Sequence, residues 1–576
     1  MSAAYQGLPA APGIGMGAIY LHRGRELELE YSTSTVISLA RAPFNPQTEW
    51  ERFLHAKKLV DQQLMEMGTS LNHVAADIFA MHRLILSDVT LTDSVRIAIH
   101  EEGRSAISAT RRTILDMAQV FQELDDAYFA GRATDIIDIG RRLLTFLGAP
   151  IETGRLSELP PGSILLTEDL TPSEIATLPV AAVAGIALAR STPTAHTSIL
   201  ARSLGFPLVC GLGTAILEES RAQQAIVDGY SGQLILSPSP EQLARYQAQQ
   251  IRDADRSAEA VRRAHEPAVT LDGLKMPVYI NANTTDDVAA LGESGADGIG
   301  LLRTEYLFQN RNEPPTVDEQ CAIYTAFARQ TDNRLLTIRA LDAGGDKPLE
   351  YLTHRDEYNP FLGVRGLRLL LSHPAILADQ FRAVLLAAQT LAPEMEVRFM
   401  LPMVSTLTEM EQARKLLDQV RADAGTAQTG ARVRIGPLIE VPSAALMAQQ
   451  LAGMADFLSI GTNDLAQYVL ASDRTNSRVA GMADALHPSV LQLVERTAHA
   501  AKNFYIPVSL CGELGGNAQA APLLLGLGVS ELSVPLPAAP LIKQAIRETD
   551  LFHAHQLAES ALRCRSAEEV RTLLEG

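Results

Sequence analysis

Charged and polar side chains recur at one kind of position in the second half of the chain, directly after short apolar runs. The residues at these positions are Arg303 with Glu305 close behind, Arg339 with Asp342 close behind, Glu440, the pair Asn463 and Asp464, and Cys511. Taken singly, each is more often a solvated charge beside a strand or a small buried group. Together, arginines that bind anionic oxygens and carboxylates that hold a hard cation predict a site for an anionic substrate. Mg²⁺ is the expected metal, with Glu440 and Asp464 as ligands, because phosphoryl transfer depends mainly on positioning and charge neutralisation.

Cys511 stands among these groups without a second cysteine or histidine at metal-ligand spacing. A zinc site is therefore excluded. Two interpretations remain, a small buried apolar residue or a thiol that donates a proton to a carbon atom. The charged residues around it favour the proton donor.

His196 is the candidate nucleophile. A neutral imidazole attacks phosphorus near pH 7 and forms a phosphoramidate that is labile enough to pass the group onward. A short apolar helix over 198–204, closed by Gly205, follows directly. A phosphate on the ring would therefore sit at a helix N-terminus, where backbone N–H groups bind anions. The chain has 13 histidines and most loop histidines are structural, so the flanking sequence, and not the residue type, marks this one.

The elements that position the strand-end residues form a repeating pattern from Leu274 onward. Short apolar runs alternate with helical patterns about eight times, and the runs are 278–281, 298–302, 335–339, 397–402, 435–439, 457–460, 508–510 and 531–534. Such alternation predicts a (β/α)₈ barrel over 266–576, and in these barrels active sites lie at the carboxyl ends of the strands.

The first half of the chain predicts a different, discontinuous domain. Strand-like segments occur at 17–21, 163–167, 183–188 and 233–236, whereas residues 45–147 contain almost no proline and have apolar residues at helical spacing. A strand at 17–21 left alone would be unpaired, so residues 1–25 are expected to join 150–236 in one α/β domain. The segment 26–149 is then an inserted bundle of about four helices. Residues 237–265 are charged and rich in glutamine and predict a linker helix.

Composition limits the class of protein and its partners. A chain of 576 residues is too long for one hydrophobic core and should form about three domains. The net charge of −18 disfavours nucleic acid and suits a small basic protein partner. Four widely spaced cysteines predict reduced thiols. The chain lacks a long apolar run and a signal-peptide pattern, so a cytoplasmic protein without membrane insertion is expected.

Four motifs together resemble those of phosphoenolpyruvate-utilising enzymes. The segment Thr194-Ala-His-Thr-Ser-Ile-Leu-Ala-Arg-Ser-Leu-Gly205 resembles their phosphohistidine motif. Their barrel motifs are similar to Gly300-Leu-Leu-Arg-Thr-Glu-Tyr306, Phe457-Leu-Ser-Ile-Gly-Thr-Asn-Asp-Leu465 and Cys511-Gly-Glu513. Residues 7–17 and 123–128 fit as well, so the resemblance covers essentially the whole chain and is closest to the Enzyme I family of the bacterial phosphotransferase system.

This resemblance implies a phosphoenolpyruvate-protein phosphotransferase. The phosphoryl group would pass from phosphoenolpyruvate to His196 and then to a histidine of the carrier HPr or an HPr-like protein, with release of pyruvate, as the first step of sugar uptake. The implied substrate ligands are Arg303, Arg339, Arg365, Asn463, Asp464 and Arg474, with Mg²⁺ on Glu440 and Asp464, and Cys511 would protonate the enolate. The resemblance further implies a swivelling phosphohistidine domain, an HPr-docking bundle at 26–149 and a homodimer formed by the barrel domain.

One segment departs from the family pattern. Residues 191–195 read Ser-Thr-Pro-Thr-Ala, where relatives usually have Gly-Gly-x-Thr-Ser. Pro193 fixes φ and removes an N–H donor, so phosphate contacts near His196 are expected to be fewer or different. A nitrogen-type or fused multiphosphoryl branch and a non-catalytic signalling relative remain open. A dikinase needs a further nucleotide-binding domain, for which the chain has no room.

Overall fold

The computed structural model separates into two compact units. It describes residues 3–22, 44–70, 73–123, 127–149, 156, 159–193, 195–218, 223–289, 291–309, 311–332, 334–345, 349, 351–352, 357–423, 432–474 and 479–575. The first unit comprises Met1–Asp253 with Arg474–Arg478, and the second comprises Ala254–Asp473 with Val479–Gly576. Among the helices of these residues, none combines the length and apolar character needed to cross a lipid bilayer.

An eight-stranded sheet forms the base of the first unit, in the order β1-β8-β7-β3-β4-β5-β6-β2. Its strands are β1 (Ala3–Gln6), β2 (Leu8–Ala11), β3 (Ile14–His22), β4 (Ser163–Thr167), β5 (Val183–Leu188), β6 (Leu208–Cys210), β7 (Gln224–Asp228) and β8 (Gln233–Leu236). Since Gly7 alone joins β1 to β2, the two edges of the sheet lie close together and the sheet is strongly curled. The N-terminal strand β3 pairs with β4 and β7, which follow the bundle in the sequence.

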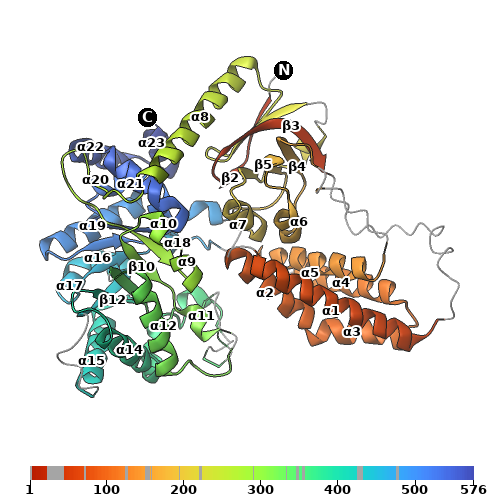
Figure 1. The fold of residues 1–576 in the computed structure, drawn as a ribbon, viewed down its shortest axis with the longest axis horizontal. Helices are drawn as coiled ribbons and strands as arrows, with labels where there is room; N and C mark the ends of the chain where they lie inside the picture. The colour runs from red at the N-terminus through yellow and green to blue at the C-terminus, as the bar shows by residue number, and fades with distance from the viewer. Residues whose placement is uncertain are drawn as a thin grey trace. The chain divides into compact units, whose positions relative to one another are not determined.

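The inserted bundle consists of α1 (Pro46–Ser70), α2 (His73–Ser87), α3 (Val89–His100), α4 (Ala106–Glu123) and α5 (Ala127–Phe146). About four helices were expected, and the additional one arises because Asp88 interrupts the second. The Asp88 carboxylate accepts the Thr90 N–H at 2.7 Å and so begins a new helix. The bundle shares one hydrophobic core with α6 (Pro172–Thr177), α7 (His196–Ser203) and the sheet, and Figure 1 shows α6 and α7 between the sheet and the bundle.

A buried polar network crosses from the bundle to α6. The His82 ring lies with Nε2 3.1 Å from Asp135 and Nδ1 3.4 Å from Asp138. Arg142 contacts both Asp138 and the Ser173 hydroxyl, and that hydroxyl donates to Asp138. Because these groups are almost fully buried, their mutual pairing fixes how the bundle meets the α/β layer.

Helix α8 (Pro240–Arg262) occupies most of the predicted linker and crosses the boundary between the units. In its first half, Tyr246 donates to Asp228 at 3.3 Å and Gln250 donates to the Ile14 carbonyl at 2.9 Å. Just beyond its end, the buried Lys543 ammonium donates to the Ala264 carbonyl at 2.7 Å. Each end of the linker is therefore held by the unit to which it belongs.

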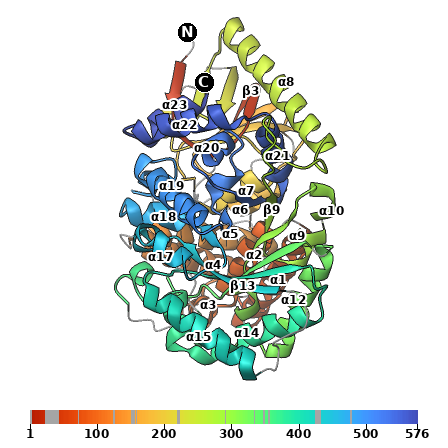
Figure 2. The same ribbon diagram turned by 90° about the vertical axis from the view of Figure 1, so that its left-hand side faces the viewer.

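The second unit is a closed barrel of eight parallel strands, which confirms the predicted fold class. The strands are β9 (Val278–Ala282), β10 (Gly298–Leu302), β11 (Leu335–Arg339), β12 (Glu396–Leu401), β13 (Arg432–Ile439), β14 (Leu458–Ile460), β15 (Val508–Leu510) and β16 (Glu531–Pro535). Figure 2 shows helices arranged around them, among them α12 (Val317–Gln330), α14 (Pro374–Gln389), α15 (Leu407–Asp423), α18 (Thr462–Val469) and α19 (Pro488–Asn503). Each predicted strand lies within a few residues of an observed one.

A buried ion pair fills one end of the barrel interior. Arg398 on β12 donates to both carboxylate oxygens of Glu531 on β16, at 2.5 and 3.0 Å, and its guanidinium lies 5.3 Å from the centre of the Phe457 ring. Both charges are almost completely buried, and Arg398 also donates to the partly exposed Glu396 at 2.7 Å, so Glu531 depends on Arg398 to offset the cost of its desolvation.

Replacing Glu531 with glutamine should therefore lower the free energy of unfolding of the barrel by about 3 kcal/mol, because the buried Arg398 loses a bidentate carboxylate and keeps only the partly exposed Glu396 at 2.7 Å. Urea denaturation followed by circular dichroism measures the change. Glu411→Gln, on the exposed face of α15, is the matched control and should be neutral. A loss below about 1 kcal/mol in Glu531→Gln would show that the pair is not a main support of the barrel.

Candidate active site

Arg365 is the most completely buried cation at the carboxyl end of the strands. It precedes α13 (Leu367–Ser372), and only 1% of the residue is exposed. Its guanidinium donates to Asp342 at 3.1 and 3.0 Å and to Asp464 at 3.2 and 3.1 Å. Burial lowers the pKa of Arg365, but Asp342 and Asp464 outweigh this and hold it above its ordinary value. The structure therefore fixes a permanent positive charge beside the predicted metal ligand Asp464.

Arg339, the last residue of β11, presents a second buried guanidinium. One nitrogen donates to Glu305 at 2.6 Å, and another lies 3.6 Å from Asp342. Its Nε atom is buried and has no hydrogen-bond partner among the described residues. A buried donor without a partner costs free energy that the oxygen of a bound anion would recover. This geometry favours a ligand with anionic oxygens at the barrel mouth.

Glu440 and Asp464 form a surplus of negative charge. Glu440 follows β13, is 1% exposed, and accepts the Met403 N–H at 2.7 Å. Burial, and then the nearby Asp464 and Asp342 carboxylates, raise the pKa of Glu440 from its ordinary 4.5 to about 8. Carboxylates that are buried this close together repel one another, and a bound cation would offset this repulsion.

The two carboxylates fit Mg²⁺ rather than a metal held entirely by protein. The described residues contain no cluster of three or more histidine, cysteine or acidic side chains arranged to hold a metal. Mg²⁺ is usually bound by one or two carboxylates and completes its shell with water and substrate oxygens. Glu440 and Asp464 would be the protein ligands of such an ion.

Asn463, in the first turn of α18, and the loop that contains Cys511 are held together by hydrogen bonds. The Asn463 side chain accepts the Glu513 N–H at 3.0 Å and donates to the Glu513 carboxylate at 3.2 Å. Gly512 allows the close approach, because a Cβ atom there would lie 2.0 Å from the Thr462 hydroxyl. Cys511 is 6% exposed, and burial raises the pKa of its thiol, so it stays protonated at neutral pH. A buried thiol of this kind can donate a proton to carbon.

The remaining two substrate-binding candidates are less constrained. Arg303, directly after β10, is exposed and its guanidinium lies 3.5 Å from the Asn283 side chain. Arg474 lies after the end of α18 and groups with the first unit. The structure thus gathers Arg339, Arg365 and Asp464 through shared partners, whereas the roles of Arg303 and Arg474 stay predictions.

His196 is the first residue of α7, two residues earlier than the predicted helix start, and its side chain lies outside the described part of the structure. The preceding residue, Ala195, gives the helix no side-chain cap. The Thr197 hydroxyl donates to the Leu170 carbonyl at 2.7 Å and the Ser198 hydroxyl donates to the Thr192 carbonyl at 2.6 Å. These bonds fix the start of α7, whose first N–H groups are left without a side-chain cap.

The segment before His196 contains a strained residue. Ser191 has a φ of 79°, a left-handed conformation that side chains with a Cβ atom disfavour. Replacing Ser191 with glycine should raise the free energy of unfolding by about 1 kcal/mol, whereas Ser191→Ala keeps the Cβ atom and should give no gain. Thermal denaturation of both variants measures the difference. Equal stability of the glycine and alanine variants would mean that no strain is stored there.

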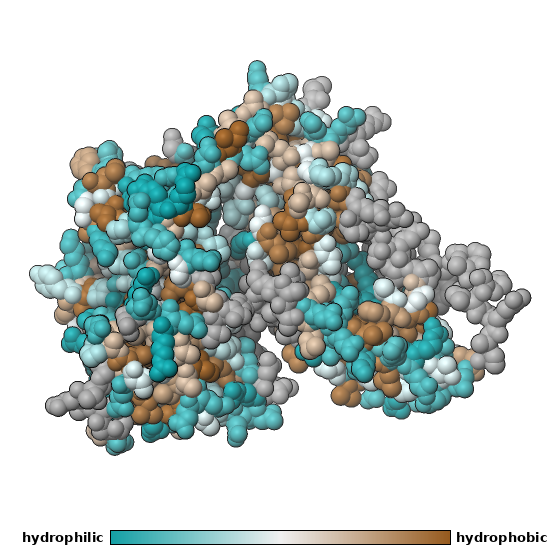
Figure 3. All heavy atoms as spheres, in the orientation of Figure 1, coloured by the Kyte–Doolittle hydropathy of each residue, from teal (hydrophilic) through white to brown (hydrophobic). Residues whose placement is uncertain are grey.

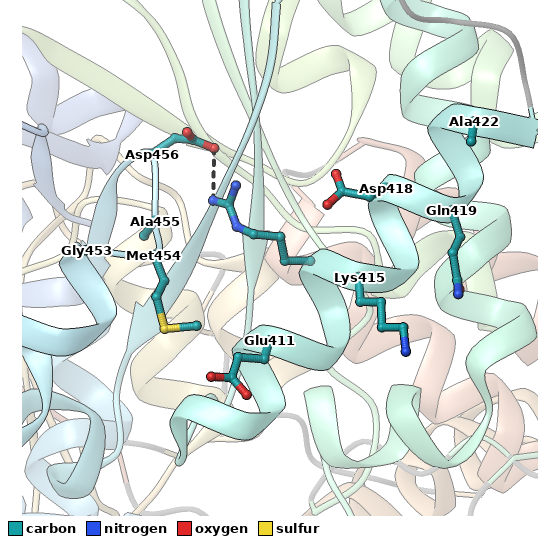
Figure 4. A pocket seen from close by; sticks show the side chains of 10 residues that line it. Glu411, Lys415, Asp418, Gln419, Ala422, Gly453, Met454, Ala455 and Asp456 are labelled. Carbon is teal, nitrogen blue, oxygen red and sulfur yellow. Dashed lines mark hydrogen bonds and ion pairs between the residues drawn. The ribbon is translucent and has the colours of Figure 1, made fainter.

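A cavity of about 730 Å³ lies elsewhere on the barrel, between α15 and the segment Gly453–Asp456 (Figure 4). Its lining includes both acidic and basic side chains, and Arg414 contacts Asp456 at 3.4 Å. Because Asp456 precedes β14, this cavity is near the amino ends of the strands. It is therefore not the predicted site.

Comparison with known proteins matches three parts of the chain to one family. Residues 6–132 match the N-terminal domain of PEP-utilising enzymes, residues 159–232 match the mobile domain, and residues 257–551 match the PEP-binding domain. The chain belongs to the PEP-utilising enzyme family. The predicted phosphohistidine segment lies in the mobile domain of this family, and the predicted substrate residues lie in its PEP-binding domain.

Similar members of the family are of two kinds. A multiphosphoryl transfer protein of Rhodobacter capsulatus is 39% identical over 98% of this chain, which spans about two thirds of that protein, 67% of its length. A phosphoenolpyruvate-protein phosphotransferase of Geobacillus stearothermophilus is 36% identical over 98% of this chain and 96% of its own length. The phosphoenolpyruvate-protein phosphotransferase of Haemophilus influenzae is 34% identical over 99% of this chain and 98% of its own length.

Several residues of this PEP-utilising enzyme take part in the site without having been predicted as ligands. Glu305 and Asp342 hold the arginines, and the sequence placed them close to the mouth without showing which charge each one balances. The Tyr468 hydroxyl lies 3.4 Å from Arg365. Its position one helical turn after Asp464 on α18 is a signal that could have found it. The Met403 N–H on Glu440 is a backbone contact, which no pattern of side chains predicts.

Proposed function

We propose that this chain is a phosphoenolpyruvate-protein phosphotransferase, which transfers the phosphoryl group to His196 and then to a histidine of HPr or an HPr-like carrier. The observation that supports this best is the pair of buried arginines at the barrel mouth, of which Arg339 keeps an unpartnered Nε donor. Relatives covered almost completely by this chain are named for the same activity.

In this proposal phosphoenolpyruvate binds at the barrel mouth. Its anionic oxygens contact the substrate ligands, which are Arg303, Arg339, Arg365, Asn463, Asp464 and Arg474. When bound to Glu440 and Asp464, Mg²⁺ would neutralise phosphate charge. The fixed guanidinium groups of Arg339 and Arg365 orient the phosphoryl group and need little rearrangement, since their carboxylate partners already hold them.

The reaction joins two balanced steps. A neutral nitrogen of His196 forms a bond to phosphorus while the bond from phosphorus to the enol oxygen breaks, leaving the enolate of pyruvate. The Cys511 thiol then gives its proton to the methylene carbon, and the enolate becomes the ketone of pyruvate. His196 would travel between the barrel and the carrier by a swivel of the α/β domain.

The carrier would dock on the bundle, part of the N-terminal family domain. Apolar side chains there are exposed to solvent, among them Leu84 at 58%, Val89 at 70% and Val120 at 60%. Figure 3 shows hydrophobic residues interspersed with hydrophilic ones over this part of the surface. Exposed apolar side chains with a polar rim suit a protein partner. A homodimer through the barrel domain and a cytoplasmic location belong to the same proposal.

A fused multiphosphoryl branch is the second candidate. It is favoured by the Rhodobacter capsulatus relative, a multiphosphoryl transfer protein that is longer than this chain. In that branch the carrier histidine would belong to a domain on the same polypeptide.

Pyruvate formation tests the proposed activity. With phosphoenolpyruvate and Mg²⁺ alone, the protein should release at most one pyruvate per chain, because phospho-His196 has no acceptor. Adding purified HPr should give continuous release, and removing the metal with EDTA should stop it. Continuous pyruvate release without a carrier would indicate a phosphatase instead, and no release under any condition would refute the assignment.

A further inference from the structure

Two serines line the barrel interior directly beneath Cys511. Ser459 is the middle residue of β14 and Ser509 is the middle residue of β15, and the two are paired across the parallel strands. Their strand neighbours are apolar residues of the core between the strands and the helices, namely Leu458, Ile460, Val508 and Leu510. Since side chains alternate along a strand, the two serines point to the inside of the barrel.

The two hydroxyls and the thiol form a directed chain of hydrogen bonds. Ser509 donates to the Ser459 oxygen at 2.9 Å, and Ser459 donates to the Cys511 sulfur at 3.4 Å. The Cys511 sulfur in turn lies 3.6 Å from the Ile460 carbonyl, which can accept the thiol proton. Because the Ser459 oxygen already accepts the Ser509 proton, its own hydrogen is directed to the sulfur.

The two hydroxyls and the thiol are buried among apolar side chains. Ser459 is fully buried and Ser509 is 4% exposed, while the thiol packs with Leu301, Met400, Leu438 and Phe457. Burying a hydroxyl in apolar surroundings costs free energy unless it is hydrogen-bonded. Here each serine offsets that cost with a hydrogen bond of the chain that ends at the Cys511 sulfur.

We propose that Ser459 and Ser509 are positioning residues for Cys511, which aim the thiol and stabilise the thiolate that remains after it has donated its proton. This inference rests on the proposed function, in which Cys511 protonates enolpyruvate. In the forward direction the S–H bond breaks and a C–H bond forms at the methylene carbon of the enolate. The resulting thiolate accepts the Ser459 hydrogen bond and regains a proton from water. In reverse, the thiolate removes a proton from the methyl group of pyruvate.

Other charged groups act on the same sulfur. Burial is the main reason why the pKa of Cys511 is raised, and Glu440 raises it further, whereas the Ser459 hydrogen bond, Arg339 and Arg303 lower it. Since a thiolate is a stronger acceptor than a thiol, loss of the Ser459 hydroxyl disfavours the thiolate. The pH at which the thiolate forms should then move upward.

The return reaction isolates this step. The protein is first labelled with ³²P-phosphoenolpyruvate and Mg²⁺ and then freed of substrate. It is next mixed with pyruvate and Mg²⁺. The transfer of label back to phosphoenolpyruvate is followed from pH 6 to 9. Return of label requires removal of a methyl proton by the Cys511 thiolate. In Ser459→Ala the return should slow by about 10- to 100-fold, as expected for loss of a hydrogen bond to a charged group, and its pH dependence should shift upward.

Three further variants separate positioning from structure. Ser459→Thr keeps a hydroxyl and should restore most of the rate, and Ser509→Ala should give a smaller loss in the same direction. Ser294→Ala removes a buried hydroxyl that bonds only backbone groups near the end of α10 (Leu291–Ser294), and it should return label normally. If Ser459→Ala does not fold, the rate and pH dependence of label return in Ser509→Ala are compared with those of the wild type instead.

Return of label at the wild-type rate with an unshifted pH dependence in the serine-to-alanine variants would overturn the positioning role. The proposed function fails in a different way, because the wild-type protein would then take up no label from phosphoenolpyruvate in the first step. The two failures are therefore distinguishable within one experiment.

Discussion

Replacing Arg365 with methionine is expected to reduce carrier-dependent pyruvate release by about 1000-fold or more, since a preorganised cation at the phosphoryl group is lost. The same change leaves Asp342 and Asp464 without the guanidinium that they share through four hydrogen bonds. The free energy of unfolding should fall by about 3–5 kcal/mol, because the two buried carboxylates lose the cation that compensates their charge. Initial rates and urea denaturation measure the two effects.

Arg382→Met is the matched control. Arg382 lies on α14 and pairs at 2.7 Å with Asp379, where both side chains are about 40% exposed. A surface pair of this kind contributes little, so activity and stability should stay close to those of the wild type. Activity of Arg365→Met within tenfold of the wild type would show that Arg365 only supports the barrel.

Binding of Mg²⁺ should depend strongly on pH. Without metal, Glu440 has a pKa of about 8 in the folded chain against an ordinary 4.5, so between these values the folded chain holds a proton that the unfolded chain has lost. The stability of the metal-free protein should therefore fall as pH rises through this window. Mg²⁺ must displace this proton, so its affinity should rise by about 50-fold between roughly pH 6 and 8 and level off near about pH 9.

Thermal shift measurements over this range test the metal site without measuring activity. The rise in Tm produced by Mg²⁺ should grow from pH 6 to 8 in the wild type and be nearly abolished in Glu440→Gln, while Glu411→Gln on the exposed face of α15 should behave as the wild type. A Mg²⁺-induced shift that is the same at all pH values, or that survives in Glu440→Gln, would place the metal elsewhere.

The architecture could be predicted because its signals are local. The barrel strands are short apolar runs that alternate with helical patterns, and this alternation located all eight strands. Four strands of the first unit were missed, namely the edge strands β1 and β2 and the inner strands β6 and β7, since runs of three to five residues show too little alternation to stand out. Their pairing depends on partners far away in the sequence.

The site could be predicted only as a set of residues. The family resemblance implied Arg365 and Asp464, but the sharing of one guanidinium between Asp342 and Asp464 depends on how the barrel closes. The same is true of Ser459, whose hydrogen bond joins β14 to Cys511 just after β15, with α18 and α19 between them in the sequence. The strain at Ser191 is a property of the backbone, and the residue type alone does not reveal it.

Mapping the phosphorylated residue tests the central proposal most directly. Wild-type protein, His196→Ala and a control, His499→Ala on the exposed side of α19, are incubated with labelled phosphoenolpyruvate and Mg²⁺, digested and analysed by mass spectrometry under alkaline conditions. Wild type and His499→Ala should carry acid-labile label on His196, at most one per chain, with an equal amount of pyruvate released, and His196→Ala should carry none. Label on a different residue, or labelling of His196→Ala, would contradict the transfer through His196.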